Sequence, residues 1–266
     1  MYLLINHKTS FRYSHPQPYA LQQIRLRPMN KPGLTVLTWK FEITGGKEEL
    51  SYKDQHQNNV DLVVLNRGKD QLTISCGGEV QTDDLSGIMG HYNMHAPTWL
   101  YRSETRLTWP GRLIKKFASQ VSKEAENDIE LLHKISAQIL KKVPYIKDQT
   151  NYATTAEEAV KLKGGVCQDH THIFISVARL LGFPARYVSG YLCLTANSAQ
   201  NSSHAWAEVF VRNLGWVGFD VSNGVSPDDQ YVPIAVGLDY NDVAPTSGIR
   251  YSQSDEKLAV TVRVEQ

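Results

Sequence analysis

The sequence predicts an α+β fold, in which a β-rich N-terminal region precedes a helical segment and a final set of antiparallel strands. Three observations support this prediction. Up to about residue 95, apolar and polar residues alternate at the period of a strand. Between about residues 110 and 181 apolar residues recur at helical spacing, and beyond residue 185 the alternation returns. Because helices followed by antiparallel strands are typical of an α+β core, we expect a β-rich domain at residues 1–100 and a second domain at residues 101–266.

The N-terminal region contains several predicted strands. Residues 34–43 alternate through much of their length, and residues 60–65 and 72–75 are shorter candidates. Residues 66–69 contain an asparagine and a glycine and form a strong turn signal between the last two. Residues 1–8 also alternate like a strand, and they lack the positive start and apolar core of a cleavable signal peptide.

Three helices are predicted in the middle of the chain. Pro110 lies near the start of the first, because its fixed φ suits the first turn of a helix. The apolar residues of this helix form one stripe: Leu113, Ile114, Phe117, Ala118 and Val121. The second helix begins near Asp128 and ends before Pro144, which has no backbone N–H to continue it. The third begins at Thr155, where the sequence has the form of a capping box, and ends near Lys163.

Two glycines precede Cys167, which lies at the start of a fourth predicted helix. The apolar face of this helix consists of Ile173, Val177, Leu180 and Leu181. Gly182 and Pro184 mark its end. A thiol at a helix N-terminus meets unpaired backbone N–H groups and the positive end of the helix dipole, and both favour the nucleophilic thiolate. Cys167 is therefore a candidate nucleophile. Cys76 and Cys193 stand in strand-like segments and are expected to be packing residues.

A predicted hairpin supplies partners for the thiolate. Residues 204–212 and 215–221 both alternate, with a glycine-containing turn between them. His204 opens the first strand and Asp220 lies at the end of the second, so antiparallel pairing is compatible with a hydrogen bond between the two side chains. The order cysteine, histidine, aspartate follows the nucleophile, base and orienting group that recur on unrelated folds. A last strand has four apolar residues on one face: Leu258, Val260, Val262 and Val264.

The overall composition argues against several classes of partner. The net charge is +1 and the basic residues are scattered, so nothing indicates binding to nucleic acid or to an anionic membrane. No segment approaches the roughly 18 consecutive apolar residues of a membrane-spanning helix. The 3 cysteines show no spacing typical of a disulfide framework, and we expect a reducing, cytoplasmic compartment.

The histidines that follow Cys167 do not predict a metal site. His170 and His172 are two positions apart on a helix, so they point in different directions. No Cys-x-x-Cys or His-x-x-x-His pair completes a zinc site, and the acidic residues at 228–229 and 239–242 lack the EF-hand pattern. We expect no metal and no cofactor. We also expect His172 to lie in the core beneath Cys167 and His170 to be exposed.

Five segments of the chain carry a resemblance to a known family. They are residues 165–169 (GVCQD), 184–191 (PARYVSGY), 204–209 (HAWAEV), 215–224 (GWVGFDVSNG) and 235–245 (AVGLDYNDVAP). In this order they resemble the transglutaminase-like superfamily of thiol enzymes, in the bacterial branch described as transglutaminase-like enzymes or cysteine proteases. The motifs cover about residues 150–250, and the N-terminal region is more loosely similar. The branch usually has arginine where this chain has Leu238.

The resemblance implies a papain-like transglutaminase core, in which the nucleophile helix packs on an antiparallel sheet. It also implies thiol-dependent acyl transfer on amide bonds, with Cys167, His204 and Asp220 as the catalytic triad. Cys167 would attack the carbonyl carbon, His204 would act as base and then as acid, and Asp220 would orient the imidazole. The resulting thioester would pass to water or to an amine. We expect a peptide or protein substrate.

Hydrolysis is the favoured interpretation, which would make the protein a cysteine protease or amidase. Water is the default acceptor unless a site excludes it, and no motif marks a second site for an amine. A protein-glutamine transglutaminase that transfers or cross-links amines is the alternative. A non-catalytic peptide-binding module on the same fold is a second alternative. Such a module would be expected to have lost a triad residue, and this chain has all three.

Further residues are expected around the triad. The backbone N–H of Cys167 is the natural first donor to the oxyanion, since it lies at the helix start. The second donor has three candidates, with Tyr152 preferred: Tyr145, Asn151 and Tyr152. Gln168 belongs to the family motif and is expected at the entrance of the site. Trp206 belongs to an aromatic-rich neighbourhood and is a candidate wall of the substrate groove.

Overall fold

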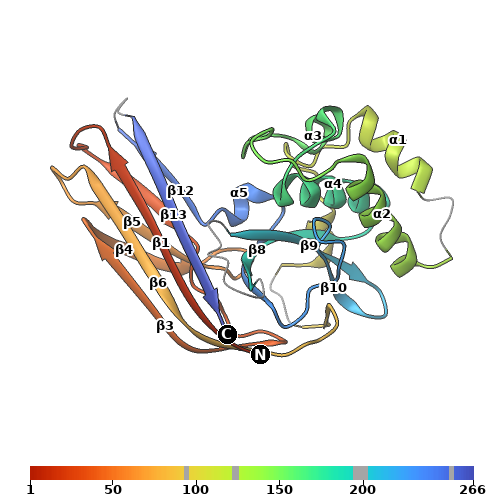
Figure 1. Ribbon diagram of the computed structural model, residues 1–266, viewed down its shortest axis with the longest axis horizontal. Helices are drawn as coiled ribbons and strands as arrows, with labels where there is room; N and C mark the ends of the chain where they lie inside the picture. The colour runs from red at the N-terminus through yellow and green to blue at the C-terminus, as the bar shows by residue number, and fades with distance from the viewer. Residues whose placement is uncertain (93–95, 122–125, 194–202, 252–254) are drawn as a thin grey trace.

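The computed structural model describes residues 1–266 apart from 93–95, 122–125, 194–202 and 252–254. Its strands form three sheets, and its helices gather against one of them (Figure 1). All the strand pairs in these sheets are antiparallel among the residues described. The predicted α+β class is therefore confirmed. In the described part of the chain, no helix is long and apolar enough to cross a membrane.

Two four-stranded sheets form the β-rich part of the molecule, on the left of Figure 1. The first consists of β13 (Glu256–Glu265), β1 (Tyr2–Tyr13), β6 (Gln71–Thr82) and β3 (Leu34–Thr44), in that order. The second consists of β12 (Thr246–Arg250), β2 (Ala20–Ile24), β5 (Asn59–Leu65) and β4 (Gly46–Lys53). Side chains from both sheets share one apolar core, which includes Phe11, Ile24, Val63 and Leu72. Burial alternates along β1, because successive side chains of a strand point to opposite faces and only one face of β1 contributes to this core.

Strands from both ends of the chain meet in these sheets. Strand β13 runs beside β1, with Leu4 opposite Glu265, and β12 pairs with β2. In the other direction β7 (Ile88–Gly90) pairs with β10 (Gly215–Phe219). The sheets thus exchange strands across residue 100, and the division into domains 1–100 and 101–266 stays a prediction.

The remaining sheet has the order β11–β8–β9–β10–β7. Its other strands are β8 (Ala185–Leu192), β9 (His204–Val211) and β11 (Tyr231–Gly237). The predicted hairpin is present, because β9 and β10 pair with Phe219 opposite Ala207. This pairing brings the start of β9 near the end of β10, which positions the candidate site.

The helices cover one face of this sheet, with α4 next to it (Figure 1). Their bounds are Arg112–Val121 for α1, Asp128–Lys142 for α2, Ala156–Leu162 for α3, Cys167–Leu180 for α4 and Tyr240–Val243 for α5, and a 3-10 helix spans Thr98–Arg102. The capping box at Thr155 is present. The burial of α4 differs from the predicted single apolar face, since Leu180 is exposed whereas Phe174 and Ile175 are fully buried. The physical reason is that α4 is the central helix, packed between the sheet and helices α1, α2 and α3.

Candidate active site

Cys167 is the first residue of α4 and is half-buried. The turn before it is held by Asp169, whose Oδ2 accepts the Val166 backbone N–H at 2.8 Å and the Thr150 hydroxyl at 2.7 Å. Gly165 permits this arrangement, because a Cβ at that position would lie 2.6 Å from the same Oδ2. Gly165, the second glycine of the pair, is therefore required by the close approach of the side chain that caps the helix.

His204 and Asp220 meet at the predicted end of the hairpin. The imidazole Nε2 of His204 lies 2.6 Å from Oδ2 of Asp220. Asp220 is fully buried and His204 nearly so. Asp220 is hydrogen-bonded to Nε2 of the imidazole. The other ring nitrogen, Nδ1, is therefore the one that can interact with a thiol.

Asp220 accepts more hydrogen bonds than the sequence indicated. The Tyr231 hydroxyl donates to its Oδ2 at 2.8 Å, and Asn223 donates its Nδ2 to Oδ2 at 2.7 Å and its backbone N–H to Oδ1 at 3.2 Å. Burial opposes ionisation of this carboxyl group, but the hydrogen bonds from His204, Tyr231 and Asn223 outweigh it and lower the pKa of Asp220. The only available sequence signal was Asn223, which falls inside one of the family motifs. No spacing pointed to Tyr231.

Burial would lower the pKa of His204, but the hydrogen bond with Asp220, the interaction with the nearby Cys167 and the charge of Asp220 raise it to about 10. The imidazole therefore holds its proton at neutral pH. The three residues proposed from the sequence therefore lie near one another in the structure.

Trp206 is largely buried, with 2% of the residue exposed. Its ring stacks near His204, with centroids 6.3 Å apart, and meets Tyr231 edge-on at 5.3 Å. Trp206 also lines a small cavity together with Tyr231 and Pro233. Its predicted role as a wall of the substrate groove stays a prediction.

The candidates for the second oxyanion donor lie at different places. Tyr152 is 70% exposed, and its backbone carbonyl accepts the side-chain N–H of Gln168 at 3.1 Å. Tyr145 forms a parallel bridge with Gly165, two residues before Cys167. Burial raises the pKa of Tyr145, with smaller effects from Cys167, Asp220 and Asp169. Tyr145 therefore lies near the candidate triad, a placement that the sequence argument did not distinguish.

Both histidines of α4 are buried. His170 was expected to be exposed, which is wrong: its Nε2 donates to the Val143 carbonyl at 2.7 Å and its Nδ1 lies 2.8 Å from the Ser222 hydroxyl. The helix is covered on this side by the segment that follows α2, which explains the difference. His172 is in the core as expected, and burial lowers its pKa to about 3, so the ring is neutral. Its Nε2 accepts the Tyr240 backbone N–H at 3.2 Å.

The other two cysteines differ from Cys167 in their surroundings. Cys76 and Cys193 are both free and buried. Burial raises the pKa of the Cys76 thiol to about 12 and also raises the pKa of Cys193. Neither is prepared to act as a thiolate, in agreement with their expected packing role.

Comparisons with known proteins identify the class to which this arrangement belongs. Residues 115–221 match the model of the transglutaminase-like superfamily, and residues 3–81 match the model of the bacterial transglutaminase-like N-terminal region. The chain therefore belongs to the transglutaminase-like superfamily. Cys167, His204 and Asp220 all fall within the matched core.

Individual relatives extend this comparison. An uncharacterized protein of Mycobacterium leprae is 26% identical over 278 residues, which cover 97% of this chain and 96% of that protein. A protein-glutamine gamma-glutamyltransferase of Pseudomonas aeruginosa is 32% identical over 100 residues, which cover 34% of this chain and 15% of that protein. The solved structure of a candidate cysteine protease from Cytophaga hutchinsonii superposes with a TM-score of 0.78 at 20% identity, covering 100% of this chain and 93% of that one. This last likeness shows that the fold is shared.

Proposed function

We propose that the protein catalyses thiol-dependent acyl transfer on amide bonds through Cys167, His204 and Asp220, and that it hydrolyses a peptide or isopeptide-like amide. The observation that carries this proposal is the 2.6 Å hydrogen bond between His204 and Asp220, beside a Cys167 that is close enough to help raise the pKa of His204. Cys167 is only half-buried, whereas Cys76 and Cys193 are buried.

The first half of the reaction forms a thioester. The Cys167 sulfur attacks the amide carbonyl carbon, so that a C–S bond forms and the carbonyl oxygen becomes an oxyanion. The backbone N–H of Cys167 has no acceptor within the helix and donates to that oxyanion, and the Tyr145 hydroxyl is the proposed second donor. The C–N bond then breaks, and the leaving amine takes the proton of the His204 imidazolium.

The second half releases the acyl group. Water attacks the thioester carbon, neutral His204 accepts a proton from that water, and the C–S bond breaks to restore the Cys167 thiolate. Asp220 stays ionised throughout, because its hydrogen bonds hold its pKa low. It keeps the imidazole in the orientation and charge state that both halves require.

Amine transfer is the second candidate. The triad chemistry is the same, and an amine replaces water in the second half. The specific observation in its favour is the partial similarity to a protein-glutamine gamma-glutamyltransferase of Pseudomonas aeruginosa. A non-catalytic peptide-binding module is disfavoured, because it has no need of a charged carboxylate buried under an imidazole at a cost in desolvation.

The proposed substrate is a peptide or protein. A cytoplasmic location is also proposed, since a reducing compartment keeps a reactive thiol such as Cys167 free.

Mass spectrometry of a peptide library distinguishes these functions. The library contains glutamine and lysine side chains and is incubated with the full chain, with and without a primary amine. Chain cleavage indicates a protease, conversion of an amide to an acid indicates an amidase, and an amine adduct indicates a transglutaminase. Cys167→Ala should abolish every product, whereas Cys193→Ala, the matched control, should retain them. Products that persist at the wild-type rate in Cys167→Ala would refute the thiol mechanism.

A further inference from the structure

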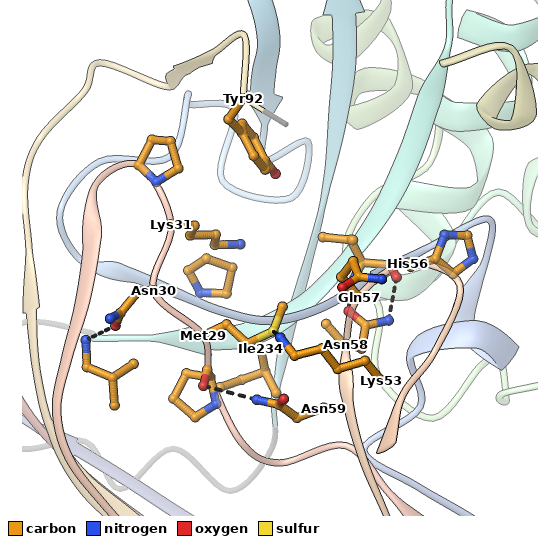
Figure 2. Close-up of a pocket in the computed structure, with 16 residues that line it drawn as sticks. Met29, Asn30, Lys31, Lys53, His56, Gln57, Asn58, Asn59, Tyr92 and Ile234 are labelled. Atoms are coloured by element: carbon orange, nitrogen blue, oxygen red, sulfur yellow. Dashed lines mark hydrogen bonds between the residues drawn. The ribbon is translucent and has the colours of Figure 1, made fainter. Parts of the chain in front are cut away.

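A cavity of about 650 Å³ lies where the N-terminal sheets meet strand β11 (Figure 2). Residues 28–32, the segment from Lys53 to Asn59, and residues 233–236 of β11 contribute to its walls. Its volume falls in the range of small-molecule sites, which are common at the junction of two structural units. None of Cys167, His204 and Asp220 lines it, so this cavity is separate from the candidate active site.

The charged groups in the cavity wall are all basic. Lys31 and Lys53 line it, and no aspartate or glutamate occurs among the described residues that do. Figure 2 shows the Lys31 side chain reaching into the cavity from one side and Lys53 from the other. Asn30 adds a donor: its side-chain oxygen accepts the Val36 backbone N–H at 2.8 Å, so its amide N–H groups are left for another acceptor.

Lys31 has no ion-pair partner among the described residues. The acidic residue that acts on it, Glu208, is already paired with Arg186 through a 2.7 Å hydrogen bond. Burial and, to a smaller extent, the positive charge of Arg186 lower the pKa of Lys31 to about 8, so the group is mostly charged at neutral pH. An anion in the cavity would supply the missing counter-charge.

Lys53 is similarly available. The described partner of its ammonium is the Met29 sulfur at 3.2 Å, and a thioether is a weak acceptor. The remaining walls are largely apolar and include Pro28, Pro233 and Ile234. A ligand that fits both the basic part and the apolar part of the cavity wall has an anionic group for the two lysines and an apolar body for the prolines and the isoleucine.

We propose that this cavity binds a small organic anion, with a carboxylate or phosphate between Lys31 and Lys53 and an apolar body against Pro28, Pro233 and Ile234. The shared chemistry of the two head groups is a set of anionic oxygens that accept charge-assisted hydrogen bonds from ammonium groups.

Isothermal titration calorimetry on the full chain tests this proposal with three probes that share one alkyl chain. Hexanoate and hexyl phosphate present the two anionic heads, and hexanamide presents a neutral one. We expect at least one anion to bind and hexanamide to bind about tenfold more weakly or not at all. The comparison of the two anions identifies the head group. Equal binding of hexanamide and both anions, or no binding of any probe, overturns the proposal.

Substitutions locate the binding. Lys31→Met should weaken the preferred anion about tenfold or more, whereas Lys31→Arg keeps the charge and should change its affinity little. Lys115→Met removes one charge from the exposed side of α1 and is the matched control for net charge. Cys167→Ala should bind as the wild type does, so failure of this proposal is distinguishable from failure of the proposed catalysis. Unchanged affinity in Lys31→Met refutes the assignment of the site.

Chemical labelling of the unmodified protein gives a readout that does not depend on the folding of a variant. Acetic anhydride modifies lysines, and peptide mapping reports the extent at each position. The preferred anion should slow acetylation of Lys31 several-fold and leave Lys115 unaffected. Equal acetylation of Lys31 with and without saturating anion contradicts the proposal.

Discussion

Replacing Asp220 with asparagine tests the contact that makes His204 basic. Asp220→Asn keeps the size of the side chain and removes its charge. The hydrogen bond to Asp220 is the largest of the effects that raise the pKa of His204 to about 10 against the burial that would lower it. Without the charge, burial prevails and the pKa of the imidazole falls. The asparagine N–H groups can also donate to Nε2, which places the ring proton on Nδ1, the nitrogen left for the thiol.

The size of the effect follows from these two changes. The rise of the His204 pKa from 6.5 to about 10 corresponds to about 5 kcal/mol at 1.36 kcal/mol per pH unit, and Asp220 supplies the largest part of it beside a contribution from Cys167. An Asp-to-Asn change in a serine protease triad reduces the rate by about 10⁴-fold, which is about 5.5 kcal/mol. The two figures are of the same order. We therefore expect Asp220→Asn to reduce kcat by about 10³- to 10⁴-fold without loss of the fold.

The assay combines kcat for the peptide product with an NMR titration of the His204 ring. Asp228→Asn is the matched control, since it removes a nearby carboxylate that accepts hydrogen bonds from Gln230 and not from His204. A rate loss below tenfold in Asp220→Asn, together with an unchanged titration of His204, refutes the reasoning.

The same variant predicts a pH dependence of stability. The folded-state pKa of His204 is raised, so its contribution to the free energy of unfolding is fully present below about pH 6.5 and is lost as pH rises through about 10. The difference in unfolding free energy between wild type and Asp220→Asn should therefore shrink between these values. Urea denaturation across that interval measures it, and a difference that grows with pH contradicts the assignment.

Three further predictions concern the surroundings of the pair. Iodoacetamide near neutral pH should label Cys167 before Cys76 or Cys193, because burial raises the pKa of the latter two, and peptide mapping measures the order. Tyr231→Phe removes one donor to a charged acceptor and should lower kcat about tenfold, as measured with the peptide assay. Gly165→Ala should displace the Asp169 carboxylate that caps α4, which lowers the free energy of unfolding in urea by about 1 kcal/mol or more and reduces activity.

Each of these predictions has a control. Equal labelling of the three cysteines contradicts an activated thiol. Tyr251→Phe removes an exposed hydroxyl and should leave kcat unchanged. An equal loss of kcat in both tyrosine variants would show that Tyr231 has no specific role in the site. Gly164→Ala meets the end of the exposed Gln149 side chain, which can move, and so should be milder than Gly165→Ala. The reverse order would show that Asp169 does not set the helix start.

The sequence could predict those parts of the site that depend on local patterns. Cys167 was placed at a helix start by its glycines and by the helical spacing that follows, and His204 and Asp220 were joined by a hairpin of two alternating strands. These inferences need only the period of an element and the position of its ends. The Asp220 carboxylate and the His204 imidazole accordingly meet at 2.6 Å.

The remaining features depend on contacts between segments that are distant along the chain. Tyr231 donates to Asp220 from strand β11, which β8 and β9 separate from β10 in the sheet, and its spacing along the sequence follows no local rule. His170 is buried beneath the segment at the end of another helix, where the Val143 backbone carbonyl accepts a hydrogen bond from its ring. Likewise, the sequence predicts β13 as a final strand but does not indicate its partner, and only the tertiary structure places it beside β1. Periodicity identifies a strand but not its partner.

Strand β11 gives the N-terminal region a physical connection to the candidate active site. At its start Tyr231 donates to Asp220, and near its end Val236 exchanges two hydrogen bonds of 2.8 Å with the side chain of Asn58, in a segment of the N-terminal region. Asn58 is itself fixed by Asp54. Among the described residues β11 is an edge strand of its sheet, so no described strand pairs with it on its outer side. The N-terminal region therefore takes the place of a neighbouring strand and restrains the segment that carries a donor to the Asp220 carboxylate.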